Sequence, residues 1–156
     1  MLSSKTLQTL NSLAELAVEA VVKKLKLTKL LADKEVSVVM ADNKTIKALN
    51  NVYRGKNYAT NVLSFPYIKF RKGEMMEKRS LTNVVGEMVI SLEKCAEEAE
   101  EQNKTLNDHL VHLTIHSMLH LLGYDHEKSK KEAAEMERLE IDILKNSFKI
   151  KNPYLI

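Results

Sequence analysis

Glycine, proline and aromatic residues are all scarce in this chain of 156 residues. It has 4 glycines, 2 prolines and no tryptophan, and aromatic residues make up 5% of it. This composition excludes collagen-like and low-complexity chains and disfavours an all-β fold with many turns. The low aromatic content also leaves few rings for a platform on which nucleic-acid bases could stack.

Cysteine is almost absent, and long apolar runs are missing. Cys95 is the only cysteine, which excludes an intrachain disulfide and fits a reducing cytosol, so we expect a cytoplasmic protein. Residues 1–6 lack the apolar core of a signal peptide. The uncharged stretch at residues 110–124 is too short and, with three histidines, too polar to span a bilayer. We interpret it as a buried helix.

The remaining composition is that of a globular protein, with 44% apolar and 29% charged residues. The length fits one domain, so we expect residues 1–156 to form a single domain. Apolar spacing and capping residues predict helices at residues 5–26, 42–51, 92–101, 106–122 and from Ser129 onward, and strands at 36–40, 62–67 and 84–90. The expected fold class is α+β, with a small mixed β-sheet packed against about five helices.

Three histidines form the pattern His116-x3-His120-x5-His126. Residues i and i+4 share one face of a helix, so His116 and His120 can converge on one ion. Gly123 can adopt a left-handed conformation and turn the chain back, which lets His126 reach the same ion. Three imidazoles without a fourth protein ligand are typical of a catalytic Zn²⁺ site, although other transition metals also suit them. We therefore predict one metal ion on a central helix and the loop after it.

Two further histidines lie close to this pattern on the same predicted helix. His109 and His112 share nearly the same face as His116 and His120. They could be alternative ligands, but no later residue is spaced to complete a set with them. We interpret them as core residues or as neighbours of the ligands.

The spacing matches the zinc-peptidase pattern H-E-x-x-H-x-x-G-x-x-H at every position except the glutamate. Ser117 occupies the position of that glutamate, which is the general base of the peptidases. A serine hydroxyl is too weakly basic at neutral pH to activate water in this way. Peptide hydrolysis is therefore disfavoured.

A basic segment precedes the histidines. Residues 54–79 carry a net charge of +5, which favours an anionic substrate such as a phosphate ester, although a solvated loop has the same composition. Its basic residues are Arg54, Lys56, Lys69, Arg71, Lys72, Lys78 and Arg79. Arg54 stands out because Gly55 allows the backbone to bend close to a ligand there. A guanidinium can bind phosphate through two hydrogen bonds and stabilise additional charge on phosphorus.

Four motifs resemble those of the YbeY family of bacterial endoribonucleases, which mature ribosomal RNA. They are LNNVYRGK at 49–56, TNVLSFP at 60–66, GEMVIS at 86–91 and HSMLHLLGYDH at 116–126. The resemblance covers roughly residues 35–145. It implies a single-strand-preferring, metal-dependent endoribonuclease that acts in 16S rRNA 3′-end maturation and ribosome quality control. It also implies ribosomal RNA and the small ribosomal subunit with its associated proteins as partners.

The resemblance assigns roles by motif position. His116, His120 and His126 correspond to the metal ligands, and Arg54 corresponds to the catalytic arginine. The chain departs from the family pattern at Tyr58-Ala59, where Lys-Pro is usual, at Glu87, where Asp is common, and at Ser117, where Gly is common. The N-terminal strand of the family is also short or missing here.

Other residues near these motifs have two interpretations each. Glu87 could face the metal or point outward from a strand, and Asp125 could orient His126 or cap a turn. Tyr124 could pack in the core or contact substrate. Cys95 lies in an acidic helix and is interpreted as a buried, inert thiol.

The mechanism and two competing functions stay open at this point. Either metal-activated water or the neighbouring ribose 2′-OH could attack the phosphodiester, with Arg54 stabilising the phosphorane. The alternatives to a nuclease are a ribosome assembly factor with a mainly structural metal and a metallohydrolase of another substrate.

Overall fold

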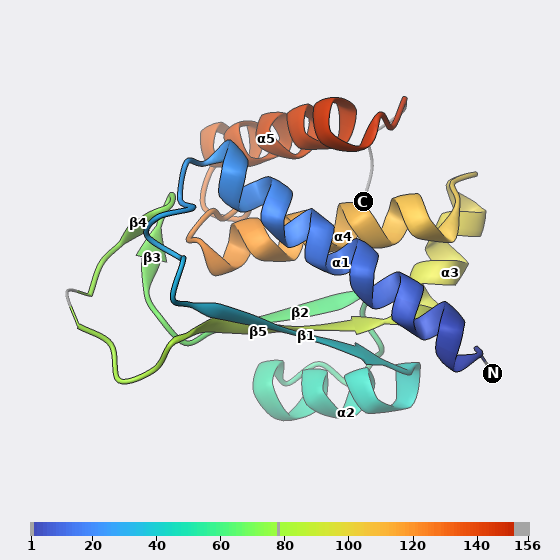
Figure 1. Ribbon diagram of the computed structural model, residues 1–156. Helices are drawn as coiled ribbons and strands as arrows, with labels where there is room; N and C mark the ends of the chain where they lie inside the picture. The colour runs from blue at the N-terminus through green and yellow to red at the C-terminus, as the bar shows by residue number, and fades with distance from the viewer. Residues whose placement is uncertain (1, 78, 152–156) are drawn as a thin grey trace.

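The computed structural model describes residues 2–77 and 79–151 (Figure 1). Lys78, one of the basic residues counted above, lies outside the described residues. The helices are α1 (Ser4–Lys24), α2 (Asn43–Arg54), α3 (Leu92–Glu101), α4 (Leu106–Leu121) and α5 (Lys130–Phe148). The strands are β1 (Glu35–Ala41), β2 (Val62–Pro66), β3 (Phe70–Arg71), β4 (Glu74–Met75) and β5 (Val84–Ser91).

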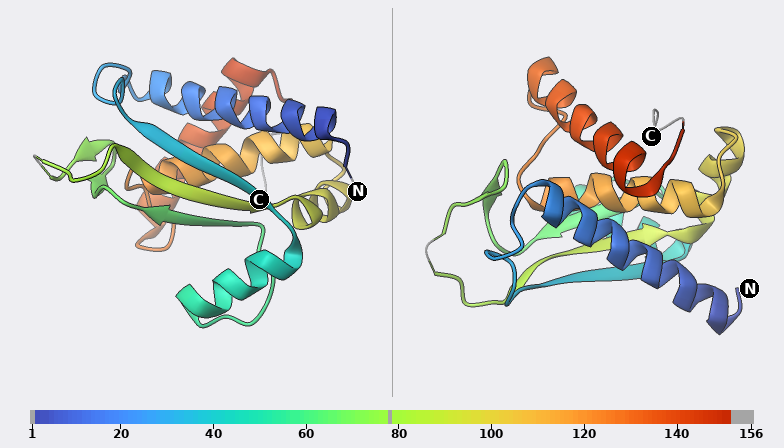
Figure 2. Two further views of the ribbon diagram at one scale, coloured as in Figure 1. Left: turned by 60° about the horizontal axis from the view of Figure 1, so that its bottom comes forward. Right: turned by 45° about the horizontal axis from the view of Figure 1, so that its top comes forward.

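The main sheet has three strands in the order β1-β5-β2. Strand β1 runs parallel to β5, and β2 runs antiparallel to β5 on its other side. Helix α2 covers one face of this sheet, while α1 and α4 lie against the other and α5 lies further out (Figures 1 and 2). The expected α+β class with a small mixed sheet is confirmed.

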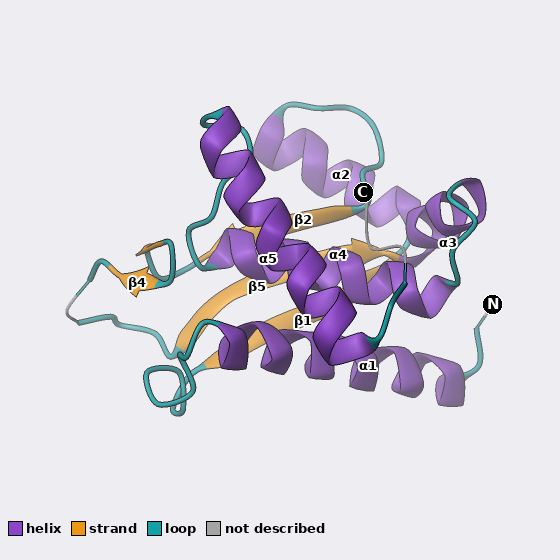
Figure 3. Cartoon of the chain, turned by 90° about the horizontal axis from the view of Figure 1, so that it is seen from above, coloured by secondary structure: helices purple, strands orange, loops and turns teal. Residues whose placement is uncertain are grey.

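Helix α4 is the centre of the packing. Eleven of its sixteen residues are buried, because β2 and β5 lie on one side of it and α1, α3 and α5 contact its other sides (Figure 3). A helix that is apolar on nearly all sides belongs in the interior, so the interpretation of residues 110–124 as a buried helix is confirmed. No helix among the described residues has the length and apolarity that crossing a membrane requires.

Side-chain caps set the helix starts. Asp42, Ser91 and Ser129 each accept a hydrogen bond from the backbone N–H three residues later, as the sequence predicts. Thr105 caps α4 in the same way, although the sequence around it indicates only a break between two helices. The predicted helices therefore all form, with bounds that differ by a few residues.

One element was not predicted. Strands β3 and β4 form a short hairpin within the basic segment, where Lys72 and Gly73 both have positive φ, of 47° and 83°. The backbone N–H groups of Lys72 and Gly73 donate to the carbonyl oxygens of Gly123 and Leu122. These bonds fasten the hairpin to the end of α4. No strand precedes α1 among the described residues, which fits the missing N-terminal strand.

Gly123 makes this attachment possible. It has a φ of +87°, and a Cβ atom there would lie 2.2 Å from the carbonyl oxygen of Phe70. Both the left-handed backbone and the close approach of β3 therefore require glycine. The predicted helix stop at Gly123 is confirmed.

We expect Gly123→Ala to lower the free energy of unfolding by about 3 kcal/mol, because it combines backbone strain with a steric clash. Gly55→Ala is the matched control, since Gly55 also has a positive φ, of 67°, but has open space around the added Cβ. It should cost only about 1–2 kcal/mol. Urea denaturation of both variants measures the difference. Equal losses would show that the contact with Phe70 is not what demands glycine.

Candidate metal centre

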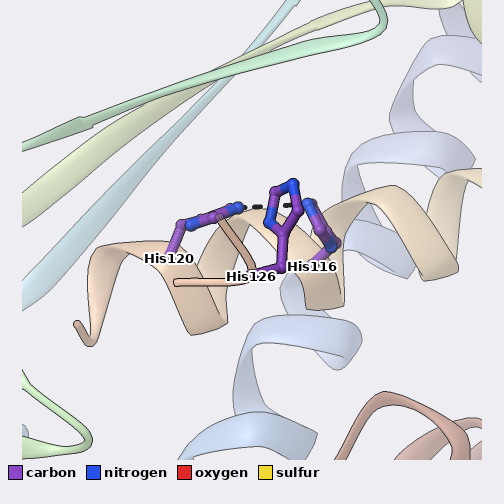
Figure 4. Close-up of side chains that lie close together, drawn as sticks. All are labelled: His116, His120 and His126. Carbon is purple, nitrogen blue, oxygen red and sulfur yellow. Dashed lines mark hydrogen bonds between the residues drawn. The ribbon is translucent and has the colours of Figure 1, made fainter. Parts of the chain in front are cut away.

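Three imidazoles from two neighbouring segments come together beside the sheet. His116 and His120 lie one turn apart near the end of α4, and His126 lies in the loop that Gly123 turns back (Figure 4). One ring nitrogen of each lies within 4.8 Å of the other two. The Nε2 atoms of His116 and His120 are 3.1 Å apart. The arrangement expected from the spacing of the three histidines is therefore present.

These nitrogens fit a transition-metal ion. Bonds of about 2.0–2.1 Å in a tetrahedral zinc site place ligand nitrogens about 3.3 Å apart, close to the 3.1 Å between the Nε2 atoms of His116 and His120. Among the described residues no fourth side chain joins the group, so a bound ion would keep a position for another molecule. Burial, together with the imidazoles of His116 and His126, lowers the pKa of His120 to about 4. His120 is thus neutral near pH 7, the form that binds metal.

A carboxylate from α5 fixes the orientation of His116. Nδ1 of His116 donates to Oε1 of Glu140 over 2.5 Å, and Nε2 of the same ring points toward Nε2 of His120. Glu140 is buried, with 7% of its surface exposed. Burial raises the pKa of Glu140, but hydrogen bonds from His112 and His116 outweigh burial and lower it to about 2. An ionised carboxylate of this kind sets the tautomer of a metal-binding histidine and makes it more basic.

His109 and His112 do not join the three histidines. Both are buried on α4, and Nζ of Lys104 lies 3.3 Å and 3.2 Å from their Nδ1 atoms. Nε2 of His109 is 2.9 Å from Glu98, and Nε2 of His112 is 3.5 Å from Oε2 of Glu140. Burial lowers the pKa of His112. They are core residues, and His112 is also linked to His116 through Glu140.

A cleft of about 740 Å³ opens over the three histidines, and β2, the end of α2 and the loop after α4 line it. Arg54 is part of this lining. It is exposed as the last residue of α2, which runs past the expected end at residue 51. Gly55 then bends the backbone in the left-handed conformation, a bend that the sequence predicts. The structure therefore brings Arg54 and the histidines to one cavity.

Of the other basic residues in this segment, those that the structure describes are not part of this lining. Lys72 makes ion pairs with Glu135, at 2.9 Å, and with Glu132, at 3.9 Å. One charge of the basic segment thus holds the hairpin to α5. Arg54 alone among the described basic residues of this segment is placed where it could bind an anion in the cleft, and Lys72 is neither in the cleft nor a purely solvated residue.

The structure distinguishes between the interpretations of the other candidate residues, which are Glu87, Asp125, Tyr124 and Cys95. Glu87 lies 3.5 Å from the hydroxyl of Tyr67 and does not line the cleft, and Asp125 caps the turn by accepting from the N–H of Glu127. Tyr124 is buried and also lines the cleft. Burial raises the pKa of the Cys95 thiol to about 12, in agreement with an inert cysteine.

Ser117 lies in the core and is not part of the lining of the cleft. It is fully buried, and its hydroxyl lies 2.7 Å from that of Ser64 on β2. This bond joins α4 to the sheet. Ser117 is therefore a structural residue at the position where the zinc peptidases carry their base.

Sequence reasoning missed Glu140, although a signal was available. The spacing of Met136, Ile143 and Leu144 places them on one face of the last helix, and Glu140 lies on that same face. A glutamate within an apolar stripe needs a buried partner, because burying an unpaired charge is costly. Nothing in the sequence indicates that the partners are His116 and His112.

The chain is similar to a protein family, to curated members of that family and to one solved structure. The family model described as Endoribonuclease YbeY matches residues 2–147. A curated Endoribonuclease YbeY from Paramagnetospirillum magneticum is 44% identical over 77% of this chain and 71% of its own. One from Bartonella bacilliformis is 39% identical over 93% of this chain and 86% of its own. The solution structure of TM1509 from Thermotoga maritima matches with a TM-score of 0.53 and 28% identity, over 99% of this chain and 94% of that one.

We expect Glu140→Gln to weaken zinc binding about 10- to 100-fold, because the neutral amide no longer makes His116 more basic. Competition with a chromophoric chelator measures the affinity. Glu98→Gln is the matched control, since Glu98 is bonded to His109 and not to the three clustered histidines. It should leave zinc affinity unchanged. Equal affinities for Glu140→Gln and the parent would contradict this role of the carboxylate.

Proposed function

The chain belongs to the YbeY family of endoribonucleases, and we propose that residues 1–156 form one metal-dependent endoribonuclease domain. Its substrate is single-stranded ribosomal RNA, cleaved during 16S rRNA 3′-end maturation and ribosome quality control. One zinc ion is held by His116, His120 and His126, and Arg54 is the catalytic residue. The protein acts in the cytoplasm, on the small ribosomal subunit and its associated proteins.

One observation carries this proposal. Arg54 and the three histidines lie in the same cleft, although Arg54 ends α2 and the histidines belong to α4 and the loop after it. A phosphodiester bound in this cleft would border both the three histidines that would hold the metal and the positive charge of Arg54. That combination suits a reaction in which negative charge builds up on phosphorus.

A zinc ion at the three histidines would supply Lewis acidity and lower the pKa of a bound water toward about 7. The protein supplies orientation and charge. Glu140 holds the ring of His116 in one tautomer through its Nδ1. Arg54, exposed at the end of α2, can donate two hydrogen bonds to the non-bridging phosphate oxygens and neutralise the charge that develops there. A 2′,3′-cyclic phosphate product would identify the ribose 2′-OH as the nucleophile.

The two competing functions have less support. Peptide hydrolysis needs a general base where Ser117 is buried against Ser64. A purely structural metal is usually enclosed by four protein ligands, whereas three histidines here border an open cleft. An assembly role can accompany nuclease activity, because binding to the ribosome presents the substrate.

We expect Arg54→Ala to lower the rate of RNA cleavage about 10²- to 10³-fold, because one stabilising contact to the transition state is lost. The measurement is cleavage of 16S precursor RNA with end-mapped products. Arg138→Ala is the matched control, since Arg138 is exposed and does not line the cleft. Cleavage by Arg54→Ala at the parental rate would remove Arg54 from the mechanism.

We expect His116→Ala to lose both bound metal and cleavage, whereas Arg54→Ala should keep the metal. Elemental analysis of the purified proteins measures the metal-to-protein ratio. The two variants together separate metal binding from catalysis. An unchanged metal content in His116→Ala would exclude this residue as a ligand.

A further inference from the structure

The few aromatic residues of this chain gather at the cleft. The sequence has five tyrosines, three phenylalanines and no tryptophan. Four of these eight rings, Tyr53, Phe65, Phe70 and Tyr124, line the cavity over the histidines. The expectation that the chain has few rings for base stacking is correct for the whole sequence, but the rings are concentrated where substrate would bind.

Tyr53 differs from the other rings of the cleft because it is exposed. It is 65% exposed, whereas Phe70 and Tyr124 are buried at 7% and 8%. Tyr53 precedes Arg54 at the end of α2, so the two neighbouring residues border the same cavity. An aromatic side chain this exposed contributes little to the core, and its place beside Arg54 in the lining of the cleft is what points to a ligand.

Phe65 on β2 supports this exposed ring. The centroids of Tyr53 and Phe65 are 5.2 Å apart and their planes meet at 67°, an edge-to-face contact. Such a contact is attractive and restricts the orientation of both rings. Tyr53 is thus held in place by one neighbour while most of its surface still faces solvent.

We propose that Tyr53, supported by Phe65, is a binding site for an unpaired base next to the scissile phosphate. This inference rests on the proposed function. Aromatic side chains stack on the face of any base, so the site tolerates different sequences. A base within a duplex already stacks on its neighbours, whereas an unpaired base is free to stack on Tyr53. The site therefore favours single-stranded RNA and places the adjoining phosphate near Arg54.

The first test compares variants on a short single-stranded RNA with one cleavage site. Tyr53→Ala should raise KM about 5- to 100-fold with a smaller change in kcat, because a stacking contact is lost. Tyr53→Phe should restore KM, since the ring alone carries the interaction. Tyr58→Ala is the matched control, because Tyr58 is 53% exposed but does not line the cleft. It should behave like the parent.

The second test removes the base instead of the ring. On an RNA with an abasic nucleotide beside the scissile phosphate, the parent and Tyr53→Ala should have similar KM values. If Tyr53→Ala is impaired equally on both RNAs, or matches the parent on the intact RNA, the stacking site is refuted. A defect only in ribosome binding, with normal cleavage of free RNA, would instead assign Tyr53 to a protein contact and also refute it.

Binding measurements distinguish this inference from the proposed function. In the Arg54→Ala background cleavage is slow, so fluorescence anisotropy can report the affinity for labelled single-stranded RNA with and without Tyr53→Ala. If the parent does not cleave RNA but Tyr53→Ala lowers the affinity for it, the base-binding site is supported and the nuclease function is rejected. If the parent cleaves RNA and Tyr53→Ala has no effect, the nuclease function is supported and the base-binding site is rejected.

Discussion

Every polar side chain that α4 carries into the core has to find a partner, because an unpaired polar group there costs about 1–3 kcal/mol. This constraint organises the surroundings of the helix. Glu98 on α3 accepts from His109, Glu140 on α5 accepts from His116, and Ser64 on β2 pairs with Ser117. Three different elements are thus fixed around α4 by polar contacts, in addition to apolar packing.

The same constraint connects stability with the candidate site. The ionised Glu140 is held among imidazoles in the interior, and its bond to His116 leaves Nε2 of that ring facing the cleft. An arginine or lysine partner would neutralise the carboxylate of Glu140 equally well, but it would not orient a histidine. The pairing that the fold requires is therefore also the pairing that prepares a nitrogen for metal binding.

Much of the fold and part of the site could be predicted from the sequence. Local signals were sufficient for the helices, because capping residues such as Asp42 and Ser129 act within one turn of the chain. The histidine spacing likewise predicted a cluster because helix periodicity places His116 beside His120. The β3–β4 hairpin was missed because its two-residue strands lie in a basic segment without alternation. Glu140 was missed as a partner because its contacts join residues far apart in the chain.

The attachment of the hairpin to the end of α4 has a consequence for sequence variation. The bonds from Lys72 and Gly73 to Gly123 and Leu122 use backbone atoms alone. Backbone contacts are indifferent to most side-chain exchanges but sensitive to chain length. Side-chain changes in the turn that keep its positive φ angles leave these two bonds in place, whereas an insertion or deletion of one residue would displace Phe70, which lines the cleft. The length of this turn therefore matters for how β3 lies against the histidine loop.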